Sequence, residues 1–371
     1  MTPPPRQGRR ICYLFKGGRH DRLSVNGTGP SEFFYGLPEM REQGLDVQLI
    51  EESVFGLGKR ANLFWEAFSR ITHTIVGIHA YAVLKLRQNF RKFGTVDAIV
   101  SVNNTYGLAL SYIKLRQRNV PRVVFIAMGL LPLRPSEIQR RLFNLILKRV
   151  TLATISKSEQ AHLNNLLPSC KVQYVPFGVD QDFWTPDRRD LREHEPHYIL
   201  SIGNDPNRDY ACLISAWRTD YPRLQLVTRI SLPAVRLSNI DVRDGDWRTQ
   251  ALTDSEVRDL IRGAAFVVLP IRETIQPSGQ SACLQAMACG KAVIMSNIAG
   301  LWDTELMQDG ENCILVPPGD PTRLREAIEY LLEHPQEVEN IGRRARQTVE
   351  NHFNTQLMAN AIRKLIEEDQ P

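Results

Sequence analysis

The part of the chain with the most chemical potential is residues 277–294, PSGQSACLQAMACGKAVI. These letters predict a loop of small residues, a short apolar helix that ends at Gly290, and an apolar strand from Ala292 to Met295. Where such a loop runs into a helix, the first backbone N–H groups stay unpaired and favour an anion. The sequence therefore predicts a site for a phosphate-sized anion at residues 278–281.

One polar side chain, Gln285, lies in the middle of that apolar helix. A buried amide must find hydrogen-bond partners. The partners are either backbone groups of the core or the hydroxyl groups of a ligand held against the loop. The residues alone leave both interpretations open.

A second constellation follows the apolar run that ends at Gly203. A glycine permits the close approach of a phosphate, and an arginine can bind two phosphate oxygens. Arg208 is predicted to open the next helix after the turn at 204–207. The alternative is an arginine that is solvated beside a turn.

The third constellation is the loop KGGRHD at 16–21, after the first apolar run. Lys16 and Arg19 are expected to border the acceptor or the donor phosphates beside the two glycines. The rival interpretation makes His20 a general base of an inverting enzyme. Asp21 is its neighbour in sequence, which makes a direct carboxylate–imidazole pair geometrically awkward.

Strands alternate with helices through the whole chain, and this pattern predicts open parallel sheets with helices on both faces. Among the predicted helices are Ser31–Gln43 and Thr355–Glu368. The predicted strands are 11–15, 46–50, 96–102, 122–128, 152–156, 198–203, 224–228, 240–243, 265–270, 293–296 and 314–316.

Six stretches, in order and over about 180 residues, resemble the retaining glycosyltransferases of family 4, within the glycosyl transferases of group 1. The resemblance implies a GT-B fold: an α/β protein with two doubly wound Rossmann-like domains that face each other across a cleft. The stretches are VPFGVDQDFW at 175–184, YILSIGNDPNRDY at 198–210, AMACGKAVI at 286–294, DGENCILVPPGD at 309–320, LREAIEYLLEHP at 324–335 and IGRRARQTVENHF at 341–353.

This resemblance also predicts the domain organisation. Residues 1–10 form a disordered tail without the apolar segment of a secretion signal, and 11–184 form an N-terminal domain on the acceptor side. Residues 185–354 form a C-terminal domain that binds the nucleotide sugar. Residues 355–371 form a helix that crosses back to the first domain. The boundary falls in the charged stretch TPDRRDLREHEP at 185–196.

The resemblance assigns Arg208 to the donor diphosphate, because the family carries a basic residue there. The family's other basic residue, directly after the glycine, is Asn204 here. In the first half, the family's histidine that touches the donor sugar is replaced by Met128 or Gly129. The retaining reaction relies on the donor's own phosphate, which fixed positive groups stabilise, so the chain can lack this histidine and still act.

The family also carries two glutamates eight positions apart, and the second, which holds the donor ribose, falls on Gln285. Counting back eight positions gives Pro277, so the loop is lengthened and Glu273 is the candidate for the first glutamate. Taken together, the expected catalytic residues are Arg208 and Glu273. The expected donor-binding residues are Gly17, Gly18, Gly203, Asn204, Arg208, Ser278, Gly279, Gln280, Ser281 and Gln285, and the acceptor-side residues are Lys16, Arg19 and His20.

Charge is distributed unevenly between the two halves of the chain. Residues 1–150 hold 23 Lys and Arg against 10 Asp and Glu, and residues 151–371 hold 23 against 31. A basic first half suits an anionic lipid or a phosphate-bearing acceptor. Nucleic acid is the less favoured partner, because no nucleic-acid-binding signature is present.

Membrane association is predicted to be peripheral. The apolar runs Ile71–Leu84 and Ala98–Ile113 are too short or too polar to span a bilayer. Residues 59–92 and 134–149 mix aromatic and aliphatic residues with basic ones, which favours an anionic membrane surface. The alternative is an apolar face packed on the sheet with a solvated basic face. The expected location is the cytoplasm, at the inner face of the membrane.

No metal or cofactor is predicted. The six cysteines are scattered without a Cys-x-x-Cys pair, and they indicate small core residues in a reducing compartment. Asp244–Gly245–Asp246 is interpreted as a turn after a strand rather than as a metal site.

The sequence leaves three hypotheses for the function. The first is a transferase that moves a sugar from a nucleotide sugar to a saccharide or lipid-linked acceptor. The second is a non-catalytic GT-B subunit, which the substitutions at Asn204 and Gln285 and the absent histidine favour. The third, a sugar-nucleotide epimerase, is disfavoured because the basic first half would have no large acceptor.

Overall fold

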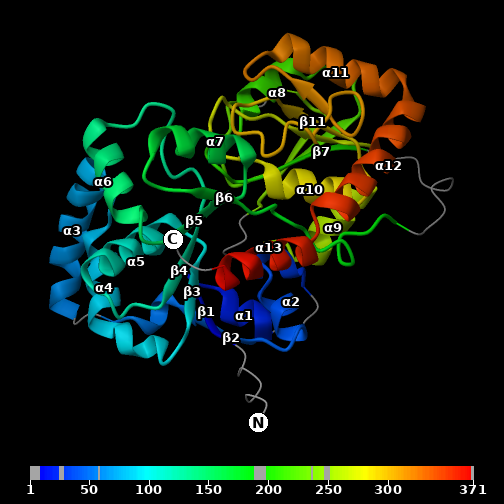
Figure 1. Ribbon diagram of the computed structural model, residues 1–371. Coiled ribbons are helices and arrows are strands. Elements are labelled where there is room, and N and C mark those ends of the chain that lie inside the picture. Colours follow the sequence, from blue (N-terminus) through cyan, green and yellow to red (C-terminus); the bar gives the residue numbers. More distant parts are fainter. Residues whose placement is uncertain are drawn as a thin grey trace. The chain divides into compact units, whose positions relative to one another are not determined.

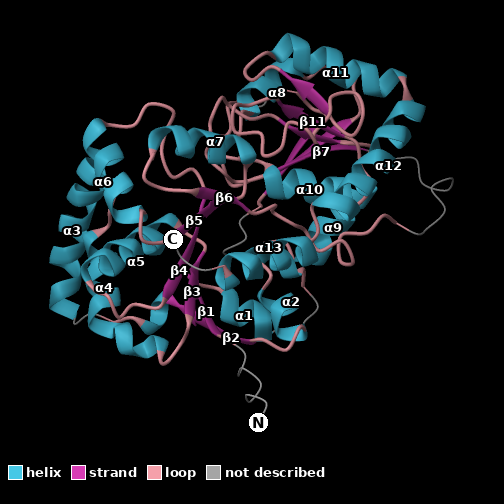
Figure 2. Cartoon of the chain, viewed as in Figure 1, coloured by secondary structure: helices cyan, strands magenta, loops and turns pink. Residues whose placement is uncertain are grey.

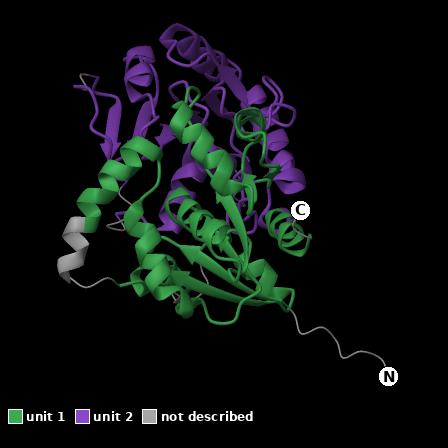
Figure 3. Ribbon diagram, turned by 60° about the vertical axis from the view of Figure 1, so that its left-hand side comes forward, with its two compact units in different colours: residues 1–176, 358–371 green, residues 177–357 purple. Residues whose placement is uncertain are grey.

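A computed structural model describes residues 9–24, 29–56, 59–187, 198–234, 237–245 and 251–368, with only the backbone for residues 24 and 59–64. The chain divides into two compact units (Figure 3). Unit 1 comprises Met1–Pro176 and Met358–Pro371, and unit 2 comprises Phe177–Leu357.

Unit 1 contains a six-stranded parallel sheet in the order β2-β1-β3-β4-β5-β6 (Figure 1). Its inner strands are largely apolar, because helices cover both faces of the sheet, and the edge strand at 46–51 alternates polar and apolar residues. The six strands follow in chain order. They are β1 (Arg10–Phe15), β2 (Asp46–Glu51), β3 (Ala98–Ser101), β4 (Arg122–Ala127), β5 (Thr151–Thr154) and β6 (Val172–Tyr174).

The helices of unit 1 lie on both sides of this sheet, with α3 to α6 on one side and α1, α2 and α13 on the other (Figure 2). They are α1 (Arg19–Ser24), α2 (Leu37–Glu42), α3 (Lys59–Val76), α4 (Ala80–Asn89), α5 (Asn104–Arg116), α6 (Glu137–Leu147), α7 (Lys157–Leu166) and α13 (Thr355–Glu367). Short 3-10 helices lie at Ser31–Phe34, Glu52–Val54 and Phe90–Phe93.

Unit 2 repeats the same design, with a six-stranded parallel sheet in the order β12-β11-β10-β7-β8-β9. Its strands are β7 (Tyr198–Ile202), β8 (Arg223–Val227), β9 (Ile240–Arg243), β10 (Val267–Leu269), β11 (Val293–Ser296) and β12 (Ile314–Val316). Its helices are α8 (Tyr210–Ala216), α9 (Asp254–Gly263), α10 (Gln280–Ala288), α11 (Pro321–Glu333) and α12 (Pro335–His352).

Each sheet has one point where the strand order reverses. In unit 1 it lies between β1 and β3, and in unit 2 it lies between β7 and β10. The loops that leave neighbouring strands in opposite directions open a crevice at the carboxyl ends, where ligands bind in sheets of this type. The loops at 16–18, 203–209 and 270–279 all start at these points.

The two parallel six-stranded sheets confirm the predicted α/β fold class. The predicted helix Ser31–Gln43 is wrong, because the chain breaks at Tyr35 (φ 52°) and Gly36 (φ 77°) into a 3-10 turn and α2. Gly36 also has no room for a side chain: a Cβ there would lie 2.5 Å from Ala359 Cα. A close approach of α13 therefore sets the break, which no local pattern contains. The three-residue strand β6 was not predicted.

The segment 177–184 groups with unit 2, whereas the expected boundary lies after residue 184. Val179 N donates to Phe353 O. Trp184 is buried, and its carbonyl oxygen accepts a hydrogen bond from Arg346 Nη1 at 2.7 Å. These contacts with α12 hold the segment in unit 2. The predicted linker at 185–196 lies mostly outside the described residues.

The expected tail, residues 1–10, lies outside the described residues except for Arg9 and Arg10, and Arg10 already belongs to β1. In the described part of the chain, no helix is both long and apolar enough to cross a bilayer. All six cysteines are free thiols, and five of them are buried.

Candidate functional site

The carboxyl ends of β7 and β10 in unit 2 carry two loops that are tied together by hydrogen bonds. Arg272 N donates to Asn207 O at 2.8 Å, and Asp209 N donates to Pro270 O at 2.9 Å. Asn207 Nδ2 donates to the buried Ser278 Oγ at 2.8 Å. The turn after β7 and the loop before α10 therefore form one rigid floor at the crevice.

Arg208 lies between these two loops and is only 4% exposed. Its Nε forms an ion pair with Asp205 Oδ2 at 2.8 Å. Its Nη1 is buried and finds no hydrogen-bond partner among the described residues. Arg208 does not open a helix as predicted: α8 begins at Tyr210, after the N-cap Asp209, whose side chain accepts from Cys212 N.

Two glycines make the space that the Arg208 guanidinium occupies. A Cβ on Gly203 (φ 149°) would overlap the guanidinium. A Cβ on Gly279 would lie 3.2 Å from Arg208 Nη1 and 2.5 Å from Ile271 Cδ1. The unsatisfied Nη1 is therefore close to the first turn of α10.

Gly279 is the N-cap of α10 with φ 79°, and no side chain caps this helix start. The first intrahelical bond runs from Cys283 N to Gly279 O at 2.9 Å. The N–H groups at the beginning of a helix, together with its dipole, favour an anion. A Cβ on Gly279 would lie close to Arg208 Nη1, so the start of α10 adjoins the buried guanidinium. An anion site formed by residues 278–281 stays a prediction.

Gln285 lies on α10 and is 8% exposed, among Cys283, Leu284 and Ala286, which are fully buried. Gln280, at the first position of the helix, is also buried. The contact of either amide with a donor ribose stays a prediction.

Asn204 binds the scaffold through both ends of its amide. Its Nδ2 donates to Gly245 O at 2.6 Å, and its Oδ1 accepts from Arg229 N at 2.8 Å. Asn204 thus joins the end of β7 to the turns after β8 and β9. The expected turn at Asp244–Gly245 serves as its acceptor, and Asp246 lies outside the described residues.

Glu273 is exposed, and its Oε1 accepts from Ala299 N at 2.8 Å. Nearby, Gly300 packs against the backbone of Ile275, where a Cβ would lie 2.6 Å from the Ile275 carbonyl oxygen. Glu273 therefore fastens the lengthened loop to the turn after β11. Its expected catalytic role stays a prediction.

In unit 1, the glycine loop after β1 leads into the short helix α1. The buried Glu51, at the end of β2, accepts from Arg19 N and from His20 N. This carboxylate already satisfies two N–H groups at the start of α1, so they are not directed at a donor phosphate. Lys16, Gly17 and Gly18 are exposed in front of them.

Basic side chains gather around the same loop. His73 and His79 stack with ring centroids 4.1 Å apart. Burial, His73 and Lys16, in that order, lower the pKa of His79. Arg19 and Arg22 both lie over the ring of Phe33. The loop expected to meet the acceptor is therefore cationic. The stacked pair His73 and His79 beside Lys16 was not predicted, because it is distant from the loop in sequence.

The place of the family's histidine, after β4, is rigidly held. Asn104 Nδ2 donates to Met128 O at 2.8 Å, and Met128 N donates to Asn104 Oδ1 at 3.2 Å. The fully buried Glu159 accepts from Leu130 N at 2.9 Å, and its burial raises its pKa to about 7. Gly129 has φ 60°, which disfavours other residue types there. These contacts hold Met128 and Gly129, the two positions at which the resemblance expects a histidine.

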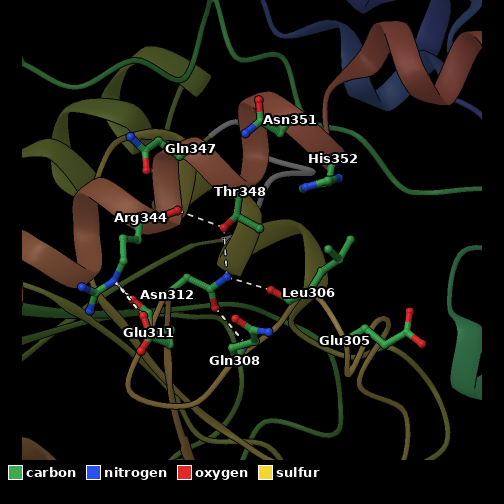
Figure 4. A pocket seen from close by; sticks show the side chains of 10 residues that line it. All are labelled: Glu305, Leu306, Gln308, Glu311, Asn312, Arg344, Gln347, Thr348, Asn351 and His352. Carbon is green, nitrogen blue, oxygen red and sulfur yellow. Dashed lines mark hydrogen bonds and ion pairs between the residues drawn. The ribbon is translucent and has the colours of Figure 1, made fainter.

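A cavity of about 290 Å³ lies elsewhere in unit 2, between α12 and the loop at 305–312 (Figure 4). Its buried Asn312 donates to Leu306 O and to Thr348 Oγ1, and accepts from Gln308 N. Arg344 donates to Gly310 O and lies 3.4 Å from Glu311 Oε2. None of the expected donor residues lines the cavity.

One basic residue near the site was not predicted. Arg229 follows β8, is exposed, and donates its backbone N–H to Asn204. Its position directly after a predicted strand is the sequence feature that could have identified Arg229 as a candidate site residue. No group of three or more His, Cys, Asp or Glu side chains suitable for a metal occurs in the described ranges.

The two sheets, with crevices at their carboxyl edges, define a GT-B fold, and solved structures confirm this class. Sucrose-phosphate synthase from Thermosynechococcus elongatus matches with a TM-score of 0.70 and 18% identity, covering 96% of this chain and 98% of that one. A glycosyltransferase from Rickettsia africae matches with a TM-score of 0.71 and 14% identity, over 97% and 98%. Anabaena HepE, in complex with UDP and glucose, gives 0.67 and 15%, over 97% and 100%.

Sequence comparison finds a similarity to a family over part of the chain. Residues 224–334 match the family model of glycosyl transferases group 1. The chain is similar to a D-rhamnosyltransferase of Pseudomonas aeruginosa, with 27% identity over 47% of this chain and 48% of that protein. It is also similar to an alpha-maltose-1-phosphate synthase of Mycobacterium tuberculosis, with 27% identity over 49% and 53%. The match spans about half the length of each of these relatives.

Proposed function

We propose that the chain is a glycosyltransferase that moves a sugar from a nucleoside diphosphate donor to a saccharide or lipid-linked acceptor, with retention of configuration, in glycan or glycolipid synthesis of a bacterial type. The GT-B fold and the similarity of residues 224–334 to glycosyl transferases group 1 support the reaction class. The similar rhamnosyltransferase and Anabaena HepE with bound UDP support a nucleotide sugar as donor. Retention and the family 4 assignment rest on the resemblance of the motifs.

The observation that carries the proposal is the buried guanidinium of Arg208. A buried charge is costly unless its hydrogen bonds are completed. Asp205 pairs with one side of the guanidinium, while Nη1 lies unsatisfied near the uncapped start of α10. A diphosphate at this place would accept from Nη1 and from the first N–H groups of the helix.

The same groups support the chemical step. Negative charge grows on the diphosphate as the sugar leaves, and fixed positive groups stabilise that charge more in the transition state than in the ground state. We therefore propose that the reaction needs neither a metal ion nor a cofactor. Arg208 is the main proposed catalytic residue. Glu273 holds the loop before α10 in place, and a catalytic role for Glu273 is the second part of the proposal.

The acceptor is assigned to unit 1. Lys16, Arg19 and His20 border the cationic loop after β1, and His79 lies near Lys16. Such a loop suits an acceptor with a phosphate or carboxylate group. We propose a cytoplasmic enzyme, placed at the inner face of the membrane when its acceptor is lipid-linked.

Calorimetric titration with UDP, GDP, ADP and dTDP tests the donor site. We expect one nucleoside diphosphate to bind, and we expect Arg208→Gln to weaken it at least tenfold. The matched control is Arg223→Gln, which removes an exposed arginine of β8 that pairs with Asp241. If none of the four binds at millimolar concentration, the proposed donor site is wrong.

A second candidate, a non-catalytic GT-B subunit, is favoured by Asn204, which replaces a basic residue and is used by the scaffold. The two candidates differ in hydrolysis. Slow release of sugar from a nucleotide sugar by the purified chain, lost in Arg208→Gln, rejects the non-catalytic role. Donor binding without any turnover, with acceptor pools of lipid and oligosaccharide, supports it.

A further inference from the structure

An exposed stripe along α6 alternates basic and apolar residues. Ile138, Arg141 and Leu145 follow one another at spacings of three and four, which places them on one side of the helix, while Arg134 precedes the helix and Lys148 is its C-cap. Ile138 is 63% exposed and Leu145 is 47% exposed. The opposite side of α6 is buried through Phe143, Ile146 and Leu147.

The neighbouring helix α3 has an exposed apolar stripe of its own. Phe68, Ile71 and Ile75 are spaced three and four apart, and the two isoleucines are 57% and 56% exposed. The end of α3 contacts α6, because a Cβ on Gly77 would lie 2.5 Å from Gln139 Nε2 and 2.8 Å from Phe143. Both helices lie on the same side of the unit 1 sheet (Figure 1).

We name this surface the α3–α6 face. It consists of Phe68, Ile71, Ile75, Ile138 and Leu145 together with Arg134, Arg141 and Lys148. Of the ten large hydrophobic side chains that are exposed among the described residues, five lie on this face. Exposed apolar side chains that gather in this way mark an interaction surface, whereas single ones carry no meaning.

The charge of the face is strongly positive on the α6 side. Residues 134–149 contain five basic side chains and one acidic one, Glu137. Glu137 binds both Arg140 and Arg141, and these hydrogen bonds, that of Arg140 first, lower its pKa to about 2. The only carboxylate of the segment is therefore already neutralised, and the remaining charge is available to an anionic partner.

We propose that the α3–α6 face binds an anionic lipid bilayer, with α3 and α6 lying in the plane of the headgroups. Isolated aliphatic side chains enter the region between the headgroups and the acyl chains, and flanking Arg and Lys side chains reach the lipid phosphates. Each basic residue near an anionic surface strengthens this attraction. This goes beyond the transferase activity, since lipid binding needs no donor.

The charge pattern favours lipid over a second copy of the chain. Two α3–α6 faces would bring the three basic side chains of one face against the three of the other, which opposes a symmetric dimer. Aliphatic side chains that alternate with cations do not form a continuous apolar core of the kind that stable protein interfaces need. An anionic bilayer satisfies both components at once.

Vesicle co-sedimentation tests the proposal. The probes are vesicles of phosphatidylcholine alone and of phosphatidylcholine with 30% phosphatidylglycerol. We expect the full chain to sediment with the anionic vesicles and to remain in solution with the zwitterionic ones. Salt should weaken the binding, because part of the attraction is electrostatic.

Two variants separate the components of the face. Arg134→Gln/Arg141→Gln/Lys148→Gln should weaken binding about a hundredfold, from three lost cations. Ile138→Asn/Leu145→Asn should weaken it at least tenfold. The matched controls are Val242→Asn on β9 and Arg343→Gln on α12, exposed residues of unit 2, which should bind as the wild type does.

Three outcomes overturn the proposal: no sedimentation with either vesicle, equal sedimentation of the face variants and the wild type, or binding that the unit 2 controls also lose. A concentration-dependent dimer that Ile138→Asn/Leu145→Asn abolishes, seen by analytical ultracentrifugation, assigns the face to a second copy instead. Calorimetry of the same variants with nucleoside diphosphates should show unchanged donor affinity. Failure of the membrane proposal is therefore distinguishable from failure of the donor site.

Discussion

At the scale of single residues, Arg208 is placed to act on the transition state more than on binding. It faces phosphate charge that grows as the sugar leaves, so Arg208→Ala should lower turnover more than it lowers donor affinity. One such electrostatic contact contributes on the order of 3 kcal/mol, or roughly a hundredfold in rate. Steady-state kinetics that separate kcat from KM check this, with Arg223→Ala as the control. A raised KM with an unchanged kcat would instead assign Arg208 to uniform binding.

Gln285 should behave in the opposite way. If it holds the ribose, it binds a part of the donor that stays the same during the reaction, so Gln285→Ala should raise the donor Kd and nearly keep kcat. Gln285→Glu should tighten binding, since an ionised acceptor makes a stronger hydrogen bond. Calorimetry measures both. If Gln285→Glu unfolds the protein or leaves the affinity unchanged, Gln285 is a core amide and the ribose lies elsewhere.

Gly203 links the residue scale to the loop around it. Its φ of 149° and the overlap that a Cβ would make with the Arg208 guanidinium leave no space for alanine. We expect Gly203→Ala to displace Arg208, to weaken donor binding as Arg208→Gln does, and to cost about 1–3 kcal/mol of stability. Thermal unfolding and donor calorimetry on one sample check this. Gly245→Ala, whose Cβ would lie 3.0 Å from Val227, is the milder comparison.

At the scale of elements, Glu159 couples α7 to the turn after β4. Its folded pKa, about 7, lies above the unfolded value of 4.5, because burial disfavours the charge. The folded state therefore holds the proton more tightly, and its stability falls as pH rises from about 4.5 to 7. The loss is at most roughly 3 kcal/mol.

Glu159→Gln removes this titration and keeps an acceptor for Leu130 N. We expect the free energy of unfolding of the variant, relative to the wild type, to increase between pH 5 and pH 8. Chemical denaturation at both pH values measures the difference, in which titrations shared by both proteins cancel. An equal difference at pH 5 and pH 8 would mean that Glu159 is already ionised or exposed.

The elements also mark the limits of prediction from sequence. Strands 240–243, 293–296 and 314–316 were located to the residue, because each is a short run with two β-branched apolar residues. The break at Tyr35 and the burial of Arg208 could not be read locally. The first depends on Ala359, more than 300 positions away, and the second on Gly279. The sequence indicated the candidate site residues by their chemical type, whereas the residues that contact them could be identified only from the structure.

Asn204 shows the same limit at a point that bears on function. The sequence indicates only a missing cation at this position. The structure gives its amide three connections, to Gly245, Arg229 and Thr228, which hold the loops of three strands. A single sequence shows only that one side chain stands in place of another. It therefore cannot tell whether the position has lost a functional residue or has gained one that supports the fold.

At the scale of the whole molecule, the segment 358–371 is part of unit 1 although it follows unit 2 in the chain. Arg363 donates to Gln43 Oε1 at 3.0 Å, Gln43 donates to Asn360 Oδ1 at 3.1 Å, and Arg9 and Arg122 donate to the carbonyls of Ile366 and Glu368. Met358, Ile362 and Ile366 are buried. Removal of residues 358–371 should therefore destabilise unit 1 by several kcal/mol, at about 1.5–3 kcal/mol for each fully buried side chain.

Differential scanning calorimetry checks this truncation. We expect the transition of unit 1 to move to lower temperature or to disappear while that of unit 2 remains. The double variant Met358→Ala/Ile362→Ala should show the same direction with a smaller shift. A single unchanged transition in both proteins would show that α13 adds nothing to unit 1.

This discontinuous organisation has a consequence for synthesis on the ribosome. Residues 177–357 form an uninterrupted segment, so unit 2 can complete its structure as soon as it emerges. The sheet of unit 1 emerges first, yet its last helix is made only after all of unit 2. Domains usually fold in the order in which they are translated. Unit 1 therefore begins to emerge before unit 2 but is finished after it, and the contact of Ala359 with Gly36 waits until residues 358–367 have been made.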